Sequence, residues 1–287
     1  MNRRRLLKTL PFAAAALASV PARAAKPIRI TRVDSNFERE PLIRPFGFKG
    51  GYMTEIWQTA ARMESESGLH KVGLCTQNVL WSDAGIFAEH TESGGNALMY
   101  ALAEYAVKIV KGQTFEHPID LLDDVLDDVF EYGKKITGNP SLRKTFALNA
   151  LVGFDNAAWL LYAAENGITN FDGLIPDRYK PGLAHRHERV ISAPSIAFTI
   201  PVNEIKQAAD DGFFFIKIKL GSPGSQQEML ERDIERLTEI HRTIGHYQTA
   251  HTADGKLPYY FDINGRYESK DTLLRLIDHA RKIGAYD

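Results

Sequence analysis

The second half of the chain alternates between short apolar runs and amphipathic stretches, and this pattern most limits the possible folds. Strands are predicted at 190–200, 213–219 and 258–263, and helices at 201–211, 226–241 and 270–283. Three successive strand–helix units predict parallel strands, because each helix carries the chain back to the start of the next strand. The near-continuous apolar run Phe213–Ile218 is typical of a strand buried on both faces.

Three such units are fewer than the eight that close a (β/α) barrel. The last residues, 283–287, read as the turn into a fourth strand. An open sheet of three strands would also leave an edge exposed. We therefore expect the chain to be a C-terminally shortened product or a fragment of a longer barrel protein.

The first half of the chain has a different order of elements. Alternation in 28–33 predicts a half-buried strand, and 52–57 and 71–76 predict two more. Helical spacing follows at 96–111, 119–132 and 142–166. This order, with the strands first and the helices after them, predicts a compact α+β domain. Cys75, the only cysteine, excludes an intramolecular disulfide and is expected to be a small buried apolar residue.

Residues 1–24 have the features of a targeting segment. The basic cluster Arg3–Arg5 is followed by an alanine-rich apolar stretch at 10–20 and by a small-x-small cleavage site at Ala22-Arg23-Ala24. The segment resembles a twin-arginine signal, which predicts periplasmic export of a folded protein. A short membrane anchor is the alternative, but the apolar stretch is too short to span a bilayer.

The charge of the remaining chain bears on its partners. Residues 1–24 contain five basic and no acidic residues, so their removal takes the formal net charge from −1 to −6. A mildly acidic protein without a basic stripe is not expected to bind nucleic acid. The remaining sequence has no apolar tract long enough for a membrane helix. The composition is compatible with both a monomer and a homo-oligomer.

Two lysines close the predicted strand at 213–219. Lys217 and Lys219 are two residues apart and point to the same side of the strand. Inside a barrel mouth, mutual repulsion and burial would lower the pKa of at least one of them, so that it could act as a base. The alternative is an edge strand with both lysines in solvent, which protects against aggregation.

Two polar residues close the strand at 258–263 in the same way. Asp262 and Asn264 share one side, and a carboxylate at a buried strand end can bind a hard cation through oxygen. Taken alone, the Asp-x-Asn-Gly sequence is better explained as an Asx turn, because turns prefer Asp, Asn and Gly. Lysine bases beside a carboxylate that holds magnesium would, however, remove a proton next to a substrate carboxylate.

These residues carry a resemblance to a known family. Lys217-Ile218-Lys219-Leu220-Gly221 resembles the second-strand Lys-x-Lys motif of the mandelate racemase/muconate lactonizing enzyme branch of the enolase superfamily. Phe261-Asp262-Ile263-Asn264-Gly265 resembles its third-strand motif. Asp155–Trp159 resembles a late helix of its capping domain, and 46–52 lies where the family has a mobile capping loop. The resemblance covers nearly all of the chain after residue 24.

The resemblance implies a fold and a division of roles. The fold would be an α+β capping domain at 26–185, followed at 190–287 by the first three βα units of a (β/α) barrel. Lys219 would abstract the α-proton and Lys217 would bind or polarise the substrate carboxylate. Asp262 would be the first Mg²⁺ ligand. Residues next to the substrate would be Asn264, Phe48, Lys49 and Tyr52.

The expected activity is magnesium-dependent abstraction of a proton α to a carboxylate, giving racemisation, epimerisation, dehydration or cycloisomerisation of a small carboxylate. The family takes two more acidic ligands and a second acid/base from later strands, which this sequence does not contain. One alternative is a barrel enzyme that forms a Schiff base through Lys217 or Lys219. Another is a non-catalytic binding protein or remnant.

Other groups of polar residues are expected to have no catalytic role. The aspartates at 120–128 are interpreted as the solvated face of a helix. His185, Arg186 and His187 are interpreted as a linker, and His241, His246 and His251 as surface residues.

Overall fold

Two long antiparallel strands, β1 (Ile28–Phe48) and β2 (Gly51–Ser65), form the centre of the N-terminal part. The computed structural model describes residues 26–48 and 50–286, so the predicted signal lies outside the described residues. With β3 (His70–Gln77) and β4 (Thr114–Phe115), these strands form a sheet of order β3-β2-β1-β4. The predicted strand at 28–33 therefore continues for 15 more residues, to Phe48.

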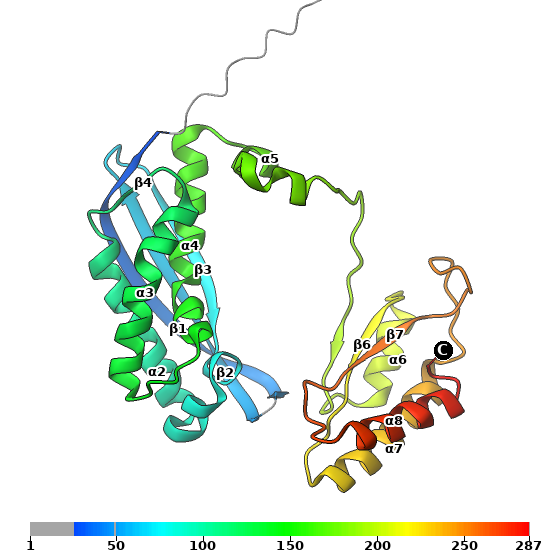
Figure 1. Ribbon diagram of the computed structural model, residues 1–287. Coiled ribbons are helices and arrows are strands. Elements are labelled where there is room, and N and C mark those ends of the chain that lie inside the picture. The colour runs from blue at the N-terminus through cyan, green and yellow to red at the C-terminus, as the bar shows by residue number, and fades with distance from the viewer. Residues whose placement is uncertain (1–25, 49, 287) are drawn as a thin grey trace, which may run out of the picture.

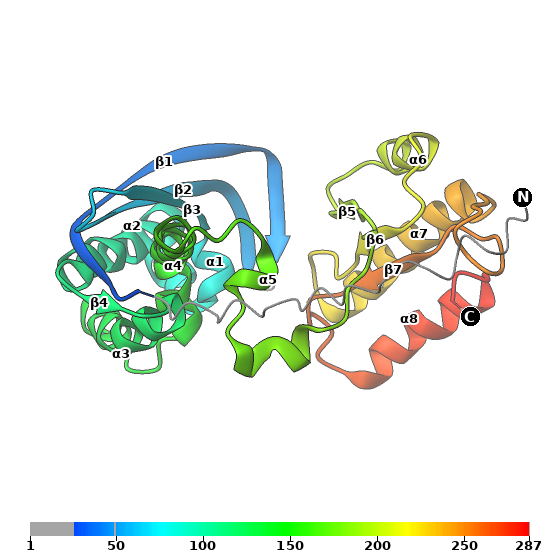
Figure 2. The ribbon, with the colours of Figure 1, turned by 90° about the horizontal axis from the view of Figure 1, so that it is seen from above.

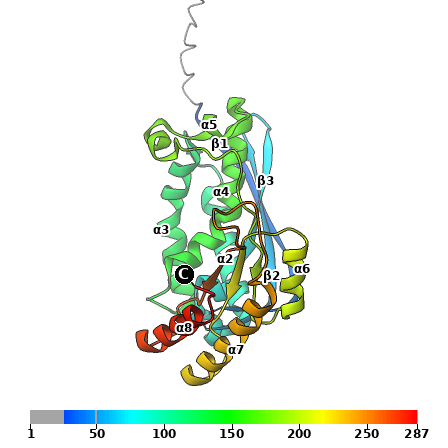
Figure 3. The same cartoon turned by 90° about the vertical axis from the view of Figure 1, so that its right-hand side faces the viewer.

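Helices cover one face of this sheet (Figures 1 and 3). They are α1 (Val79–Ser82), α2 (Ala84–Val110), α3 (Pro118–Thr137) and α4 (Lys144–Asn166). Helix α2 begins 12 residues before the predicted start at 96, because the Asp83 side chain accepts from the amides of Gly85 and Ile86 and caps it. The buried apolar faces of sheet and helices form one core, which includes Ile30, Met63 and Phe146.

Short elements and an exposed segment connect this part to the next. They are α5 (Phe171–Leu174) and the 3₁₀ helix η2 (Asp177–Leu183). The strand predicted at 190–200 is wrong in extent, since only β5 (Ser195–Ile196) forms. Val190 and Ile191 are 88% and 56% exposed, so their apolar side chains have no partner layer to pack on.

Three parallel strands, β5, β6 (Ile216–Lys219) and β7 (Tyr259–Asp262), make the second sheet. The predicted parallel pairing is confirmed. Strand β6 is shorter than predicted, because Phe213 leaves the sheet and is 37% exposed. The helices are α6 (Val202–Asp210), α7 (Gln226–Ile244) and α8 (Lys270–Lys282), and α7 lies between α6 and α8.

A second core lies between this sheet and its helices, and it includes Ile216, Ile218, Leu237 and Ile240. Helix α7 begins at a capping box, in which Ser225 and Glu228 bond to each other's backbone amides. The predicted fold class is confirmed: an α+β cap is followed by three strand–helix units of a barrel. No helix in the described ranges is long and apolar enough to cross a bilayer.

Candidate active site at the strand ends

The polar ends of β6 and β7 lie next to each other, as the sequence predicted. In the parallel register, Lys217 is paired with Tyr260 and Lys219 with Asp262. The ammonium of Lys217 lies 2.7 Å from a carboxylate oxygen of Asp262. Two lysine side chains and one carboxylate therefore meet at one edge of the sheet.

The environment of Lys219 favours its neutral form. Its side chain is buried, with only 3% of the residue exposed. Burial lowers the pKa of Lys219 below the ordinary value, and repulsion from Lys217 adds to this, while the Asp262 carboxylate opposes it. The predicted lowering of the pKa of one lysine is confirmed, and the alternative of two lysines in solvent is wrong for Lys219.

Lys217 and Asp262 hold each other in their charged forms. The hydrogen bond to Asp262 raises the pKa of Lys217 above its ordinary value, against the effect of partial burial. Burial raises the pKa of Asp262, but the contacts from Lys217, Asn264 and Lys219 together lower it by more. Lys217 is thus a fixed cation, and Asp262 is a fixed carboxylate at neutral pH.

Asn264 turns the chain directly after β7. Its backbone has φ +49°, and its amide donates to Asp262 Oδ1 over 3.0 Å, so the Asx turn suggested by the sequence does form. The Nδ2 atom donates to Asp262 Oδ2 over 3.3 Å. The Oδ1 atom is buried and has no hydrogen-bond partner within the described residues. An oxygen of this kind could accept from a ligand or coordinate a cation.

The tip of the β1–β2 hairpin covers these strand ends. Figure 2 shows the hairpin reaching from the cap toward the second sheet. The Lys219 Nζ donates to the Gly47 carbonyl over 3.4 Å and lies 4.3 Å from the centre of the Phe46 ring. A Cβ at Gly47 would lie 2.4 Å from the Phe198 ring, so any other residue here would have to displace that ring.

The three cap residues predicted to lie beside the substrate have different outcomes. Tyr52 makes an edge contact with Phe198, with ring centres 5.9 Å apart, and its pKa is raised by burial. The backbone of Phe48 pairs with Gly51 at the hairpin end. Lys49 lies outside the described residues. Phe46–Phe48 and Gly51–Tyr52 belong to β1 and β2, so these residues of the 46–52 segment form the tip of a hairpin, and the strand predicted at 52–57 lies within β2. The roles of these residues toward a substrate stay predictions.

The described residues supply only part of a magnesium site. Asp262 offers one ionised carboxylate, and Asn264 Oδ1 offers a neutral oxygen, which are ligand types that Mg²⁺ prefers. Within residues 26–48 and 50–286, no group of three or more His, Cys, Asp or Glu could hold a metal ion. The ammonium of Lys217 also occupies one side of the Asp262 carboxylate.

The other sequence candidates behave mostly as expected. All five aspartates of the predicted solvated face are exposed on α3, and the 185–187 segment is exposed. Cys75 is buried. His241 is an exception to its expected surface position, because it is partly buried and its ring bonds to the Tyr259 hydroxyl.

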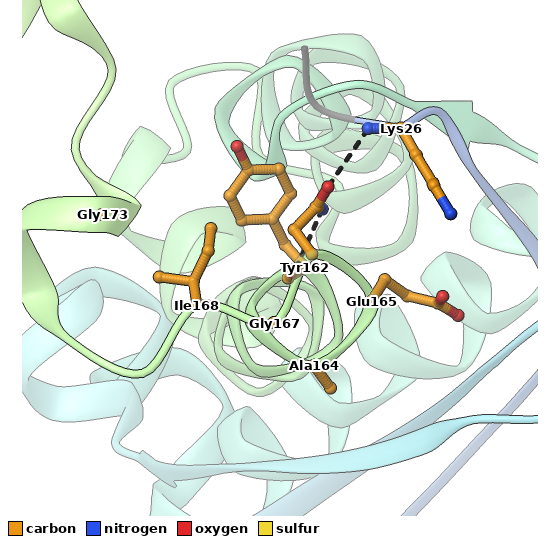
Figure 4. Close-up of a pocket in the computed structure, with 8 residues that line it drawn as sticks. Lys26, Tyr162, Ala164, Glu165, Gly167, Ile168 and Gly173 are labelled. Carbon is orange, nitrogen blue, oxygen red and sulfur yellow. Dashed lines mark hydrogen bonds between the residues drawn. The ribbon is translucent and has the colours of Figure 1, made fainter. Parts of the chain in front are cut away.

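A cavity lies elsewhere, at the C-terminal end of α4. Its volume is about 610 Å³, and its lining includes Lys26, Tyr162 and Glu165 (Figure 4). The Lys26 amide donates to Asn166 Oδ1 there, over 3.2 Å. No residue of the strand-end site lines this cavity. Its size alone therefore says nothing about the chemistry at β6 and β7.

Sequence reasoning missed the residues that support the strand ends. Asp233 in α7 is fully buried and bonds to Gly221, Ser222 and Tyr267 in the turns after β6 and β7. The signal was present, since Asp233 lies midway between Met229 and Leu237 on the apolar face of α7.

Comparisons with known proteins agree with this architecture. No protein-family model matches the chain, and no curated protein matches it. A dipeptide epimerase structure from Enterococcus faecalis V583, complexed with Mg and L-Leu-L-Tyr, superposes with TM-score 0.57 and 17% identity over 88% of this chain. The chain has the fold of the enolase superfamily.

Two other solved structures show the same fold. An L-talarate/galactarate dehydratase from Salmonella typhimurium LT2 has TM-score 0.56 and 18% identity over 96% of the chain. A mandelate racemase/muconate lactonizing enzyme from Polaromonas sp. JS666 has TM-score 0.56 and 19% identity over 89%. The chain spans 58%, 61% and 57% of the epimerase, the dehydratase and the Polaromonas protein, respectively.

Proposed function

We propose that the chain belongs to a magnesium-dependent enzyme that removes a proton α to a carboxylate, with racemisation, epimerisation, dehydration or cycloisomerisation as the outcome. The observation that carries this proposal is the buried Lys219 beside the ion pair of Lys217 and Asp262. The superfamily fold supports it, and several solved structures with this fold are complexes with Mg and either a dipeptide or L-glucarate.

The roles follow from the electrostatics of each side chain. Lys219, with its lowered pKa, would take the α-proton onto Nζ. Lys217, which stays charged, would hold the substrate carboxylate near Nζ. Asp262 and the Asn264 oxygen would hold part of the coordination sphere of Mg²⁺, which supplies positive charge toward the carboxylate of the substrate. The hairpin tip would exclude water from Lys219.

The exchange of the substrate α-proton in D₂O tests this proposal. The protein is incubated with Mg²⁺ and a panel of α-hydroxy acids, aldarates and dipeptides, and deuterium at the α-carbon is measured by NMR. We expect exchange with at least one compound, and its loss by more than about 100-fold in Lys219→Ala. Lys282→Ala, an exposed lysine of α8, is the matched control. No exchange across the panel, or exchange that survives Lys219→Ala, would contradict the proposal.

A Schiff-base enzyme is the second candidate, because a buried lysine with a lowered pKa is also a good nucleophile. It predicts that borohydride traps a carbonyl substrate on Lys219 and that EDTA has no effect. The ion pair of Asp262 has no role in that chemistry, so this candidate ranks second. A non-catalytic protein would show neither exchange nor trapping.

We also propose that residues 1–24 direct export by the twin-arginine route. The support is the basic cluster, the apolar stretch and the cleavage-site pattern in the sequence. Fusion of residues 1–30 to a folded fluorescent reporter should place the reporter in the periplasm. Replacing both Arg3 and Arg4 with lysine should leave the reporter in the cytoplasm, and an unchanged location would contradict this route.

A further inference from the structure

A single buried carboxylate joins the two strand ends of the candidate active site. Asp233 is 0% exposed. Asp233 Oδ2 accepts from the Gly221 amide (2.6 Å) and the Tyr267 hydroxyl (2.8 Å). Asp233 Oδ1 accepts from the amide (3.0 Å) and the hydroxyl (2.6 Å) of Ser222. Three donors belong to the turn after β6, and the fourth to the turn after β7.

Helix α7 holds the same turns at further points. Gln226 donates to the Arg266 carbonyl and accepts from the Glu268 amide, both over 3.0 Å, and so holds Tyr267 from both sides. Arg236 donates to the carbonyls of Ala197 and Ile200, in the turn after β5, over 3.0 and 2.9 Å. The turns that follow all three strands are therefore anchored on one helix.

The two turns also touch directly. Gly221 has φ +93°, and a Cβ there would lie 2.8 Å from Arg266 Cδ and 3.1 Å from the Ile263 carbonyl. Lys219 is two residues before Gly221, and Asp262 is one residue before Ile263. Any movement between the turns would change the separation of the Lys219 ammonium from the Asp262 carboxylate.

Packing alone does not explain a carboxylate at this position. Removing a carboxylate from water is costly, and an apolar residue of similar volume often serves stability as well or better. Asp233 lies within the apolar stripe of α7, between Met229 and Leu237, where such a residue would fit the pattern. A fully hydrogen-bonded carboxylate does fix geometry, because each donor has one preferred place.

We propose that Asp233 is a positioning residue: by bonding to both turns, it fixes the end of β6 relative to the end of β7, and so the base Lys219 relative to Asp262 and Asn264. The effect on reaction rate rests on the proposed function, whereas the effect on the two turns does not. Burial raises the pKa of Tyr267 well above its ordinary value, so Tyr267 stays protonated and donates at any working pH.

Three variants remove these links one at a time. Tyr267→Phe keeps the ring and removes only the link to the turn after β7. Ser222→Ala removes one link to the turn after β6. Asp233→Asn replaces one acceptor oxygen with an NH₂ donor, which then opposes either the two donors of Ser222 or the donors of Gly221 and Tyr267, and in both cases it disturbs the turn after β6. Glu235→Gln, an exposed acidic residue of the same helix, is the matched control.

Amide hydrogen exchange of the folded chain, followed by mass spectrometry, reads each turn separately. We expect Tyr267→Phe to speed exchange in 262–268 by about tenfold, with little change in 216–222. Ser222→Ala should instead speed exchange in 216–222, with little change in 262–268, and Asp233→Asn should speed exchange at least in 216–222. Unchanged exchange in both turns for Tyr267→Phe and Asp233→Asn, or an equal rise throughout 195–286, would overturn the proposal. If Asp233→Asn does not fold, Tyr267→Phe decides.

Kinetics on a substrate found by the α-proton exchange panel test the positioning role. We expect Tyr267→Phe to lower kcat by about 10- to 100-fold while KM changes less than about twofold, because the base is misplaced and the binding groups remain. An unchanged kcat would overturn the positioning role. If the panel yields no substrate, the proposed function fails, and hydrogen exchange still decides whether Asp233 fixes the turns.

Discussion

At the scale of single residues, two lysines of one strand have opposite electrostatic characters. Lys217 has a carboxylate at 2.7 Å and stays charged, whereas Lys219 is buried under the hairpin tip with a lowered pKa. Spacing in the sequence shows only that both point to one side. Their difference comes from the hydrogen bond of Lys217 to Asp262 and from the burial of Lys219, which contacts Phe46 and Gly47, more than 170 residues away in the chain.

The ion pair of Lys217 and Asp262 predicts a specific pH dependence of stability. The pKa of Asp262 in the folded protein is below its ordinary value of 3.8. The contribution of the ion pair to stability is therefore fully present above pH 3.8, and it is lost as the pH falls through the pKa of the folded protein. The pKa of Lys217 in the folded protein is above its ordinary value of 10.5. At alkaline pH, the contribution of the ion pair to stability is therefore lost only as the pH rises beyond 10.5.

Lys217→Met tests this dependence. We expect the variant to have a free energy of unfolding about 1 kcal/mol lower than the parent, a difference that is constant between about pH 5 and pH 9 and shrinks below about pH 4. Urea unfolding followed by far-UV circular dichroism measures it, with Lys282→Met as control. A difference that grows toward acid pH would contradict the assigned direction for Asp262.

At the scale of elements, α2 contains a sharp irregularity. Thr91 has φ +65° and ψ +173° between two helical segments, a region that non-glycine residues rarely occupy. Its hydroxyl accepts from the Gly94 amide over 3.3 Å and so caps the second segment. Next to it, the Glu92 carboxylate accepts from the amides of Thr54 and Glu55 and so anchors β2 to α2 close to the hairpin tip.

Thr91→Gly should stabilise the protein. Relief of the backbone strain is expected to exceed the loss of the cap, which costs a few tenths of a kcal/mol, and the net gain should be about 1 kcal/mol. Urea unfolding followed by tryptophan fluorescence measures the gain. Lys108→Gly, an exposed position in regular α2, should instead destabilise by about 1 kcal/mol. A loss of stability in Thr91→Gly would show that Thr91 is not strained.

Helix α4 protects the exposed edge of the first sheet. Strand β3 ends the sheet, and Asn156 and Asn149 of α4 donate to the carbonyls of Leu74 and Thr76 over 2.8 and 3.2 Å. These two asparagines are seven residues apart, which is two helical turns. Leu74 on this edge is apolar and 68% exposed. If α4 moves away from β3, the edge strand could therefore pair with another molecule.

Asn156→Ala should therefore promote self-association more than unfolding. We expect a loss of about 0.5–1 kcal/mol in stability, because one hydrogen bond is exchanged for water, and a concentration-dependent rise in apparent mass by light scattering. Asp124→Ala, an exposed polar residue of α3, should leave the mass unchanged. A monodisperse Asn156→Ala with unchanged mass would show that α4 does not guard this edge.

The sequence correctly predicted the features that depend on the local spacing of residues along the chain. The strand–helix order, the shared side of Lys217 and Lys219, and the parallel pairing all follow from spacing. Predictions failed where the outcome depends on a partner layer, as at Val190 and Ile191, which are apolar but remain exposed. The hairpin cover over Lys219 depends on a contact between residues 47 and 219, which no local pattern contains.

At the scale of the whole molecule, the described residues form two cores with few direct contacts. One core includes residues from Ile28 to Tyr162, and the other from Ile196 to Ala280. The hairpin tip makes the contacts between them, including an ion pair of Arg44 with Glu204 at 3.1 Å and a bond from Thr199 to the Pro45 carbonyl at 3.4 Å. With contacts of this kind only, we expect the two parts to unfold separately.

Spectroscopy can separate the unfolding of the two parts, because all three tryptophans, Trp57, Trp81 and Trp159, lie in the first. Tryptophan fluorescence therefore reports the cap alone, whereas far-UV circular dichroism reports the helices of both parts. We expect circular dichroism to show an earlier urea transition that fluorescence lacks, since the three-stranded part has the smaller core.

Substitutions in the two cores identify each transition. Leu237→Ala changes the second core and should move only the earlier transition, which circular dichroism detects and fluorescence does not. Leu102→Ala changes the first core and should move the transition that fluorescence detects. Each should lower its own midpoint by an amount equivalent to about 2–5 kcal/mol. Coincident transitions by both methods, moved together by either substitution, would show that the hairpin tip joins cap and barrel strands into one cooperative unit.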